Sequence, residues 1–291
     1  MQKSNYINQT TNFVQYLSEV IAGEVSVDHR FHVRDPRFKG NRSVSIANLA
    51  DGFKAYEWAG SKYDESNGKL DAIKASYDAT INATTDAHIR DAACRDMIQR
   101  VMEWGLGKGP AYKANMEWAH GHQLGLYQRI ESGREIIDSD IPDTTDFDAK
   151  LRMNAGYTKV FALLCRRSII YDGRVGAALG FLVRRYCVQS RRSEVPALLT
   201  FPWASPRSDT NGFSRDPSGD GLTFPKLNNR SRYHADWNIR ANWLIEAAML
   251  KASANSAREG RSDAWWDGED GMRKVEAALF MLGYRFDDGE M

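Results

Sequence analysis

The sequence predicts a mostly α-helical protein, and three observations indicate this fold class. Apolar residues recur at helical spacing along most of the 291 residues. Residues that cap helices stand at the ends of several of these segments. Strand-like alternation is scarce, and Ser168 to Tyr171 is β-branched but too short to form a sheet of its own. A hydrophobic content of 42% supplies a core for a chain of this length, which excludes disorder and fibrous structure.

In the N-terminal half, residues 11–22 place apolar side chains on one helical face, and Gly23 follows where a C-terminal cap belongs. Residues 24–42 are polar, basic and interrupted by Pro36 and Gly40, which predicts a loop. Further helices are expected over 43–59, 70–82 and 86–103, the last with Asp86 as its N-cap.

Beyond these helices, a glycine-rich run after Trp104 ends one helix before another begins near Tyr112. This run is no phosphate-binding P-loop, because neither Ser nor Thr follows Lys108. An acidic turn over 138–148 precedes the most informative segment. Residues 201–232 are rich in Pro, Gly, Ser and Asn, which predicts a long irregular connection before two final helices at 236–255 and 270–282.

The ends and the cysteines of the chain restrict its class further. The first residues lack the pattern of a signal peptide, and no apolar run reaches the roughly 18 residues that span a bilayer. We therefore expect a soluble, cytoplasmic protein. Cys94, Cys165 and Cys187 are far apart and form no C-x-x-C pair, so we expect buried free thiols and no disulfide framework or zinc finger.

The net charge of +1 conceals an asymmetry along the chain. Residues 150–240 contain 16 Lys and Arg against 6 Asp and Glu. A concentrated basic region is typical of a face that binds a polyanion such as DNA, because neutralised phosphates release their counterions. The alternative is a set of solvated arginines spread over several faces.

Residues 153–179 read as a tight turn, a helix, a short extended piece and a second helix. Gly156 supplies the flexible position of the turn, and Val160 and Phe161 with Leu163 and Leu164 make the first helix amphipathic. Asp172 stands where the second helix begins, near the positive end of its dipole, which favours the ionised carboxylate.

This segment resembles the signature of the helix-hairpin-helix DNA glycosylases, in which L-P-G-x-G-x-K-x-A leads through a helix to V-P-V-D-x-H/R-V. Met153–Thr158 match the hairpin, Lys159 matches the lysine of the bifunctional members, and Asp172 in Ile-Tyr-Asp-Gly-Arg-Val matches the essential aspartate. The chain is most similar to a divergent bacterial branch with an 8-oxoguanine-glycosylase-like fold. It departs from the signature in two ways: the hairpin has one glycine where the family usually has two, and Asp172 follows Lys159 by 13 positions, several fewer than in the better-known members.

The resemblance implies one two-lobed, monomeric unit over 1–291, with the hairpin and catalytic segment at about 150–185 and a C-terminal helical part at 233–291. It also implies an enzyme that extrudes a modified base from DNA and cuts its N-glycosidic bond, without a metal or other cofactor. Asp172 would stabilise the developing sugar cation, and Lys159 would be available as a nucleophile. The DNA-binding residues that the resemblance implies are Asn154, Gly156, Tyr157, Thr158 and Arg174. The basic region adds Arg184 and Arg185, together with Arg191 and Arg192, as residues expected to bind phosphate.

Several alternatives remain open from sequence. Asp172 is either catalytic or only a helix cap, and Lys159 is either a nucleophile or a solvated or phosphate-contacting lysine. Glucosylated hydroxymethylcytosine, in phage defence, is the preferred substrate, and 8-oxoguanine, in repair, is the second. A DNA-binding scaffold without the reaction is the third reading. The His29/His32 and His120/His122 pairs lack the ligand spacing of a metal site.

Aromatic residues at helical spacing are more often part of a core than of a base-binding pocket. We therefore expect at most one or two aromatic residues to stack on an extruded base, among Trp58, Trp104, Tyr112, Trp118 and Tyr127.

Overall fold

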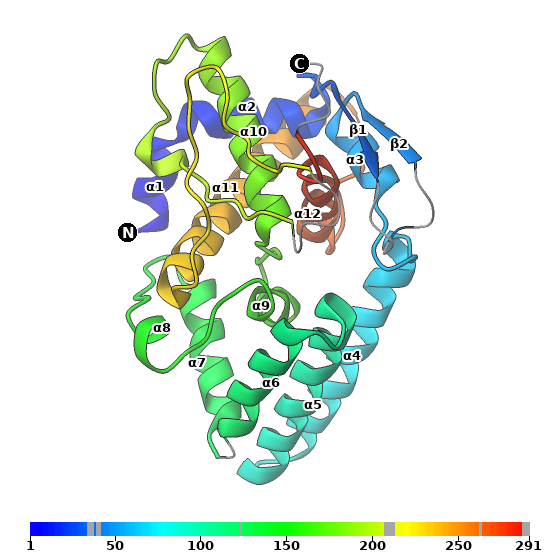
Figure 1. The fold of residues 1–291 in the computed structure, drawn as a ribbon, viewed down its shortest axis with the longest axis vertical. Helices are drawn as coiled ribbons and strands as arrows, with labels where there is room; N and C mark the ends of the chain where they lie inside the picture. Colours follow the sequence, from blue (N-terminus) through cyan, green and yellow to red (C-terminus); the bar gives the residue numbers. More distant parts are fainter. Residues whose placement is uncertain (34–37, 39–41, 123, 207–212, 262–263, 287–291) are drawn as a thin grey trace. The chain divides into compact units, whose positions relative to one another are not determined.

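The computed structural model describes residues 1–33, 38, 42–122, 124–206, 213–261 and 264–286. Helices dominate these residues, and the sheet they contain has two strands (Figure 1). This confirms the predicted mostly-α class. The chain divides by its internal contacts into two units: unit 1 comprises 1–63, 171–228 and 240–291, and unit 2 comprises 64–170 and 229–239. The segment expected at about 150–185 is thus shared between the units, which meet in the chain at residues 170 and 171.

Unit 2 is an array of helices built around α5. Its helices are α4 (Tyr63–Ala83), α5 (Ala87–Leu106), α6 (Pro110–Gly121), α7 (Leu126–Asp138), α8 (Asp146–Ala149) and α9 (Tyr157–Leu164). Helix α5 packs against α6, α7 and α9 (Figure 1). It begins as predicted, because the Asp86 carboxylate accepts hydrogen bonds from the backbone N–H groups of His88 and Ile89 at 2.8 and 3.1 Å.

A buried carboxylate on α5 also fixes the start of α7. Asp91 is 1% exposed, and it accepts hydrogen bonds from the backbone N–H groups of Gly125 and Tyr127, both at 2.8 Å. The first N–H groups of a helix have no partners within the helix, so a carboxylate here satisfies them and complements the helix dipole. Asp91 therefore ties two helices of unit 2 together.

Unit 1 surrounds helix α10. Its elements are α1 (Lys3–Gln9), α2 (Thr11–Ala22), β1 (His29–Val33), β2 (Arg42–Ile46), α3 (Leu49–Ala55), α10 (Gly173–Gln189), the short 3-10 helix η1 (Ala197–Leu199) and α12 (Gly271–Leu282). Helix α10 packs on α2 and α12, and α12 packs on α3. Helix α2 ends as predicted at Gly23, whose φ of 77° is the left-handed conformation of a C-terminal cap.

Glycine permits the close packing of α10. A Cβ on Gly176 would lie 2.1 Å from the Pro202 carbonyl oxygen, and a Cβ on Gly283 would lie 1.8 Å from the Arg174 carbonyl oxygen. Both distances are far below van der Waals contact, and in both cases the neighbouring atom belongs to the backbone, which cannot move aside as a flexible side chain can. The backbone at Pro202 and at Gly283 therefore packs directly against the first turns of α10, which fixes the position of the start of this helix within unit 1.

The sheet corrects two expectations. Residues 24–42, expected as a loop, contain β1, and the helix expected over 43–59 is replaced by β2 followed by the shorter α3. The strands pair antiparallel, with Phe31 opposite Val44. Arg42–Ile46 buries alternate residues, and β-branched Val44 and Ile46 face the core, so the period is 2 and not 3.6. Asn48 then begins α3 through a capping box with Asp51.

The remaining chain follows the predictions more closely. No helix occurs between η1 and residue 231 in the residues described there, as expected of the long connection, and α11 (Ser231–Arg258) and α12 cover the two predicted C-terminal helices. The three cysteines are buried and free, and burial raises the pKa of each thiol. No helix among the described residues is long and apolar enough to cross a membrane.

Candidate active site

The predicted hairpin lies between α8 and α9, and its backbone is held by Asn154. The Asn154 side-chain oxygen accepts hydrogen bonds from the backbone N–H groups of Gly156 and Tyr157 at 2.8 and 3.1 Å. These are the donors that a helix-hairpin-helix motif would offer to a phosphate. In this chain the Asn154 amide occupies them, so a phosphate at the hairpin would first have to displace that side chain.

Asn115, on α6, holds the hairpin through side-chain hydrogen bonds. It is 3% exposed, and its side-chain oxygen accepts hydrogen bonds from Arg152 at 2.9 Å and Asn154 at 2.8 Å. Gly156 lies so close that a Cβ there would be 2.5 Å from the Asn115 amide nitrogen. Sequence reasoning did not find Asn115, because a single polar residue within a helical segment carries no local signal of burial.

Tyr157 and Thr158 belong to the core of unit 2. Both are 0% exposed. The Tyr157 hydroxyl donates to the Asn115 carbonyl oxygen at 3.3 Å, and the Thr158 hydroxyl lies 3.4 Å from the Ile169 carbonyl oxygen. Burial also raises the pKa of Tyr157. The expectation that these two side chains contact DNA therefore meets a physical obstacle, because neither side chain is exposed.

Lys159 lies within the first turn of α9 and is 7% exposed. Its ammonium group donates to the Ala155 carbonyl oxygen at 2.7 Å, four residues earlier. Its aliphatic stem fills the space above Gly105, where a Cβ would lie 2.3 Å from the lysine Cδ. The side chain is thus packed along its stem and hydrogen-bonded at its tip, an arrangement that serves the start of α9.

Asp172 is the N-cap of α10 and is partly exposed. Its backbone is extended, and its Oδ1 accepts hydrogen bonds from the N–H groups of Arg174 and Val175 at 2.9 and 3.2 Å. The residue before it is fixed as well, since the Tyr171 hydroxyl donates to the Pro202 carbonyl oxygen at 2.8 Å. Asp172 is therefore a rigidly oriented carboxylate at the positive end of a helix, within reach of solvent.

The arginines of α10 do not form an exposed basic face. Arg174 is 3% exposed, and its guanidinium lies 4.3 Å from the Phe280 ring centroid and 4.8 Å from that of Tyr284. Arg184 is also buried, whereas Arg185 is half-buried. Because Arg174 is buried, its guanidinium is not accessible to a DNA phosphate. The arginines that directly follow α10, Arg191 and Arg192, are exposed.

One histidine of each pair, and the five aromatic residues considered from sequence, have partners within their own units. His29 Nε2 lies 2.7 Å from the Arg285 carbonyl oxygen, and His122 Nδ1 lies 2.7 Å from that of Trp118. Among the described residues, no three His, Cys, Asp or Glu gather as metal ligands would. The aromatic residues also have partners: Trp58 packs on Phe280, Trp104 bonds Ser66, Tyr112 bonds Glu103, Trp118 packs on Tyr157, and Tyr127 lies beneath Arg90.

Comparison with protein-family models, with curated proteins and with solved structures finds no match to this chain. The candidate site therefore stands on its own geometry. Unit 2 gathers the hairpin, Asn115 and Lys159, and unit 1 holds Asp172 at the start of α10.

Proposed function

We propose that this chain is a DNA glycosylase in which Asp172 is the catalytic carboxylate. The observation that carries the proposal is the cap geometry of Asp172, which follows a hairpin, a short helix and an extended segment in the order of the signature it resembles. The basic character of residues 150–240 supports a polyanionic substrate.

The geometry of Asp172 suits the chemistry of base excision. When the N-glycosidic bond breaks, its electron pair leaves with the base, and positive charge develops on the sugar. A carboxylate held in place before the reaction stabilises that charge without having to reorganise. Water then adds to the sugar carbon, and the proton it loses can pass to the Asp172 carboxylate. Two backbone N–H groups hold Oδ1 in this orientation.

The position of Lys159 favours a water-using enzyme with a single activity. A lysine nucleophile must be neutral and must swing towards the sugar carbon. Here the ammonium group donates to the Ala155 carbonyl oxygen, and the stem is packed against Gly105. Forming a Schiff base would require both interactions to break. We therefore assign Lys159 to the structure of α9 and propose no lyase step.

For the substrate we propose a large modified base, with glucosylated hydroxymethylcytosine of phage DNA as first choice and 8-oxoguanine as second. This choice rests on the resemblance to the divergent bacterial branch, which implies a role in defence against phages. A non-catalytic DNA-binding protein is the remaining alternative.

The test is an assay of abasic sites. Purified protein is incubated with phage DNA containing glucosylated hydroxymethylcytosine, with a duplex containing 8-oxoguanine, and with unmodified DNA of matched length. We expect abasic sites in the first DNA and none in the unmodified DNA. Excision from the 8-oxoguanine duplex alone would move the protein to repair, and binding to all three without excision would leave a DNA-binding scaffold.

A further inference from the structure

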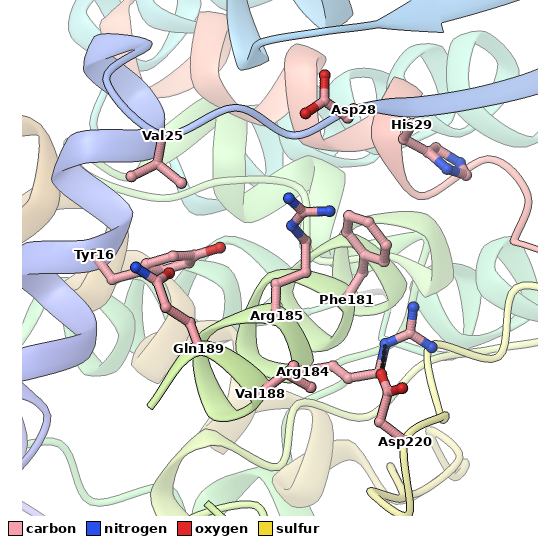
Figure 2. A pocket seen from close by; sticks show the side chains of 10 residues that line it. All are labelled: Tyr16, Val25, Asp28, His29, Phe181, Arg184, Arg185, Val188, Gln189 and Asp220. Atoms are coloured by element: carbon pink, nitrogen blue, oxygen red, sulfur yellow. Dashed lines mark ion pairs between the residues drawn. The ribbon is translucent and has the colours of Figure 1, made fainter. Parts of the chain in front are cut away.

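A cavity of about 500 Å³ lies within unit 1, at the end of α10 opposite to Asp172 (Figure 2). This volume is within the range of roughly 300–1,000 Å³ typical of small-molecule sites. Arg185 lies 13 residues after Asp172, which corresponds to about 20 Å along a helix. The cavity is therefore separate from the candidate active site, and Asp172 is not among its lining residues.

The floor of the cavity carries two positive charges. Arg184 is 4% exposed, and its guanidinium donates to the Ser218 carbonyl oxygen at 3.2 Å and faces the Asp220 carboxylate at 3.7 Å. A Cβ on Gly219 would lie 2.2 Å from its Nη1, so Arg184 is packed into the wall. Burial lowers the pKa of this guanidinium, although Asp220 acts in the opposite direction.

Arg185 is placed differently. Its guanidinium lies 5.7 Å from the Phe181 ring centroid and donates to the Ser26 carbonyl oxygen at 3.2 Å. Within the described part of the chain, no carboxylate lies within ion-pair distance of it. Figure 2 shows this guanidinium standing between Tyr16 and Phe181 in the cavity. With five N–H donors in a rigid fork, it can receive an oxyanion.

The rim of the cavity is acidic. Asp28 is exposed, with a left-handed φ of 44°, and its N–H and that of Val27 both reach the Ala47 carbonyl oxygen, at 3.3 and 2.8 Å. This bulge beside β1 directs the Asp28 side chain to the rim. Asp220, on the other side, is 55% exposed. Exposed carboxylates are screened by water, whereas Arg184 is buried and Arg185 is half-buried, so the cationic side chains act on a bound anion more strongly than the two carboxylates do.

The same rim restricts what can enter. A DNA strand carries a charge on every phosphate, so its neighbouring phosphates would meet the carboxylates of Asp28 and Asp220. A small molecule with one phosphate would place that group at Arg185 and its hydroxyl groups at the rim, where carboxylates accept hydrogen bonds. The apolar side chains of Val25 and Val188 can cover its carbon skeleton.

We propose that this cavity binds a small phosphate monoester of a hydroxylated compound, such as a sugar phosphate, with Arg185 holding the phosphate. The inference is independent of the proposed glycosylase activity, because it rests on residues at the far end of α10. It replaces the expectation that Arg184 and Arg185 contact the DNA backbone.

Calorimetry at constant ionic strength tests the proposal with inorganic phosphate, ribose 5-phosphate and ribose. The full-length protein should bind inorganic phosphate, should bind ribose 5-phosphate more tightly, and should not bind ribose. Arg185→Gln should lower the affinity for both phosphate ligands about 10- to 100-fold, because it removes a charge-assisted hydrogen bond to the phosphate. Arg258→Gln, at an exposed arginine at the end of α11 and away from the cavity lining, is the matched control and should bind as the parent does.

A second variant keeps the charges and fills the space. Val188 is 50% exposed at the cavity, so Val188→Trp is tolerated at the surface and should block entry, with loss of ribose 5-phosphate binding. Absence of binding to the parent protein would overturn the proposal. So would equal affinity in Arg185→Gln, or an equal loss in Arg258→Gln. Equal affinity of the parent for phosphate and ribose 5-phosphate would contradict the proposal that the cavity recognises the hydroxylated part of the ligand.

Discussion

At the scale of single residues, Asp172 and Lys159 differ in what their surroundings allow. Asp172 is partly exposed at the start of a helix, whereas Lys159 is 7% exposed and its stem is packed against Gly105. Sequence placed Asp172 at the start of a helix, as in the structure, because an Asp before an apolar helical run is typical of an N-cap. It could not predict the burial of Lys159, since the space that receives the stem is created by Gly105, on another helix.

The first prediction concerns Lys159. Because its ammonium group is bonded to the Ala155 carbonyl oxygen and its stem is packed, borohydride should trap no covalent adduct between the protein and substrate DNA, while abasic product still forms. A bifunctional glycosylase under the same conditions is the positive control. An adduct that forms with the parent protein and disappears in Lys159→Gln would show that Lys159 is the nucleophile.

At the scale of elements, sequence predicted most helices because each carries its own apolar period and cap, as Asp86 does for α5 and Gly23 does for α2. It missed β1 and β2 for a physical reason. Each strand has five residues and two inward-facing apolar positions, too few to distinguish a period of 2 from one of 3.6, and their pairing is a contact between separate segments.

The second prediction tests the packing of α10. Gly176→Ala would place a Cβ 2.1 Å from the Pro202 carbonyl oxygen, so the helix or the connection must move, and we expect a loss of about 1–3 kcal/mol. Gly68→Ala, on the exposed face of α4, meets nothing within 4 Å and should gain about 0.5–1 kcal/mol. Thermal unfolding followed by circular dichroism measures both. A Gly176→Ala protein as stable as the parent would contradict the close approach.

At the scale of the whole molecule, the charge asymmetry was visible in the sequence, but its distribution between interior and surface was not. Several of the basic residues of 150–240 are buried by aromatic rings or backbone carbonyls, as Arg174 and Arg184 are. If the protein binds DNA as we propose, the exposed positions therefore make the contacts. Sequence also could not place the unit boundaries, because α11 runs from unit 2 into unit 1 without a break.

The third prediction follows from this distribution. If the exposed cations of the basic region neutralise DNA phosphates, affinity should fall steeply with salt, and Arg191→Gln with Arg192→Gln should reduce the slope of log K against log salt by about 1.8. The control double variant, Lys69→Gln with Lys74→Gln, removes the same charge from α4, outside the basic region, and should leave the slope unchanged. Filter binding over a range of salt concentrations gives both slopes. Equal slopes in all three proteins would remove Arg191 and Arg192 from the DNA-binding surface.

We propose that Asp172 is catalytic and does more than begin α10, and base excision by Asp172→Asn distinguishes these two roles. Asparagine caps helices about as well as aspartate, so the variant should fold and melt as the parent does, while excision falls by about 100-fold or more through loss of the charge. Asp86→Asn is the matched control, because Asp86 caps α5 through the same pair of backbone hydrogen bonds. It should retain full activity. Parent-like excision by a folded Asp172→Asn protein would contradict the account and leave Asp172 a helix cap.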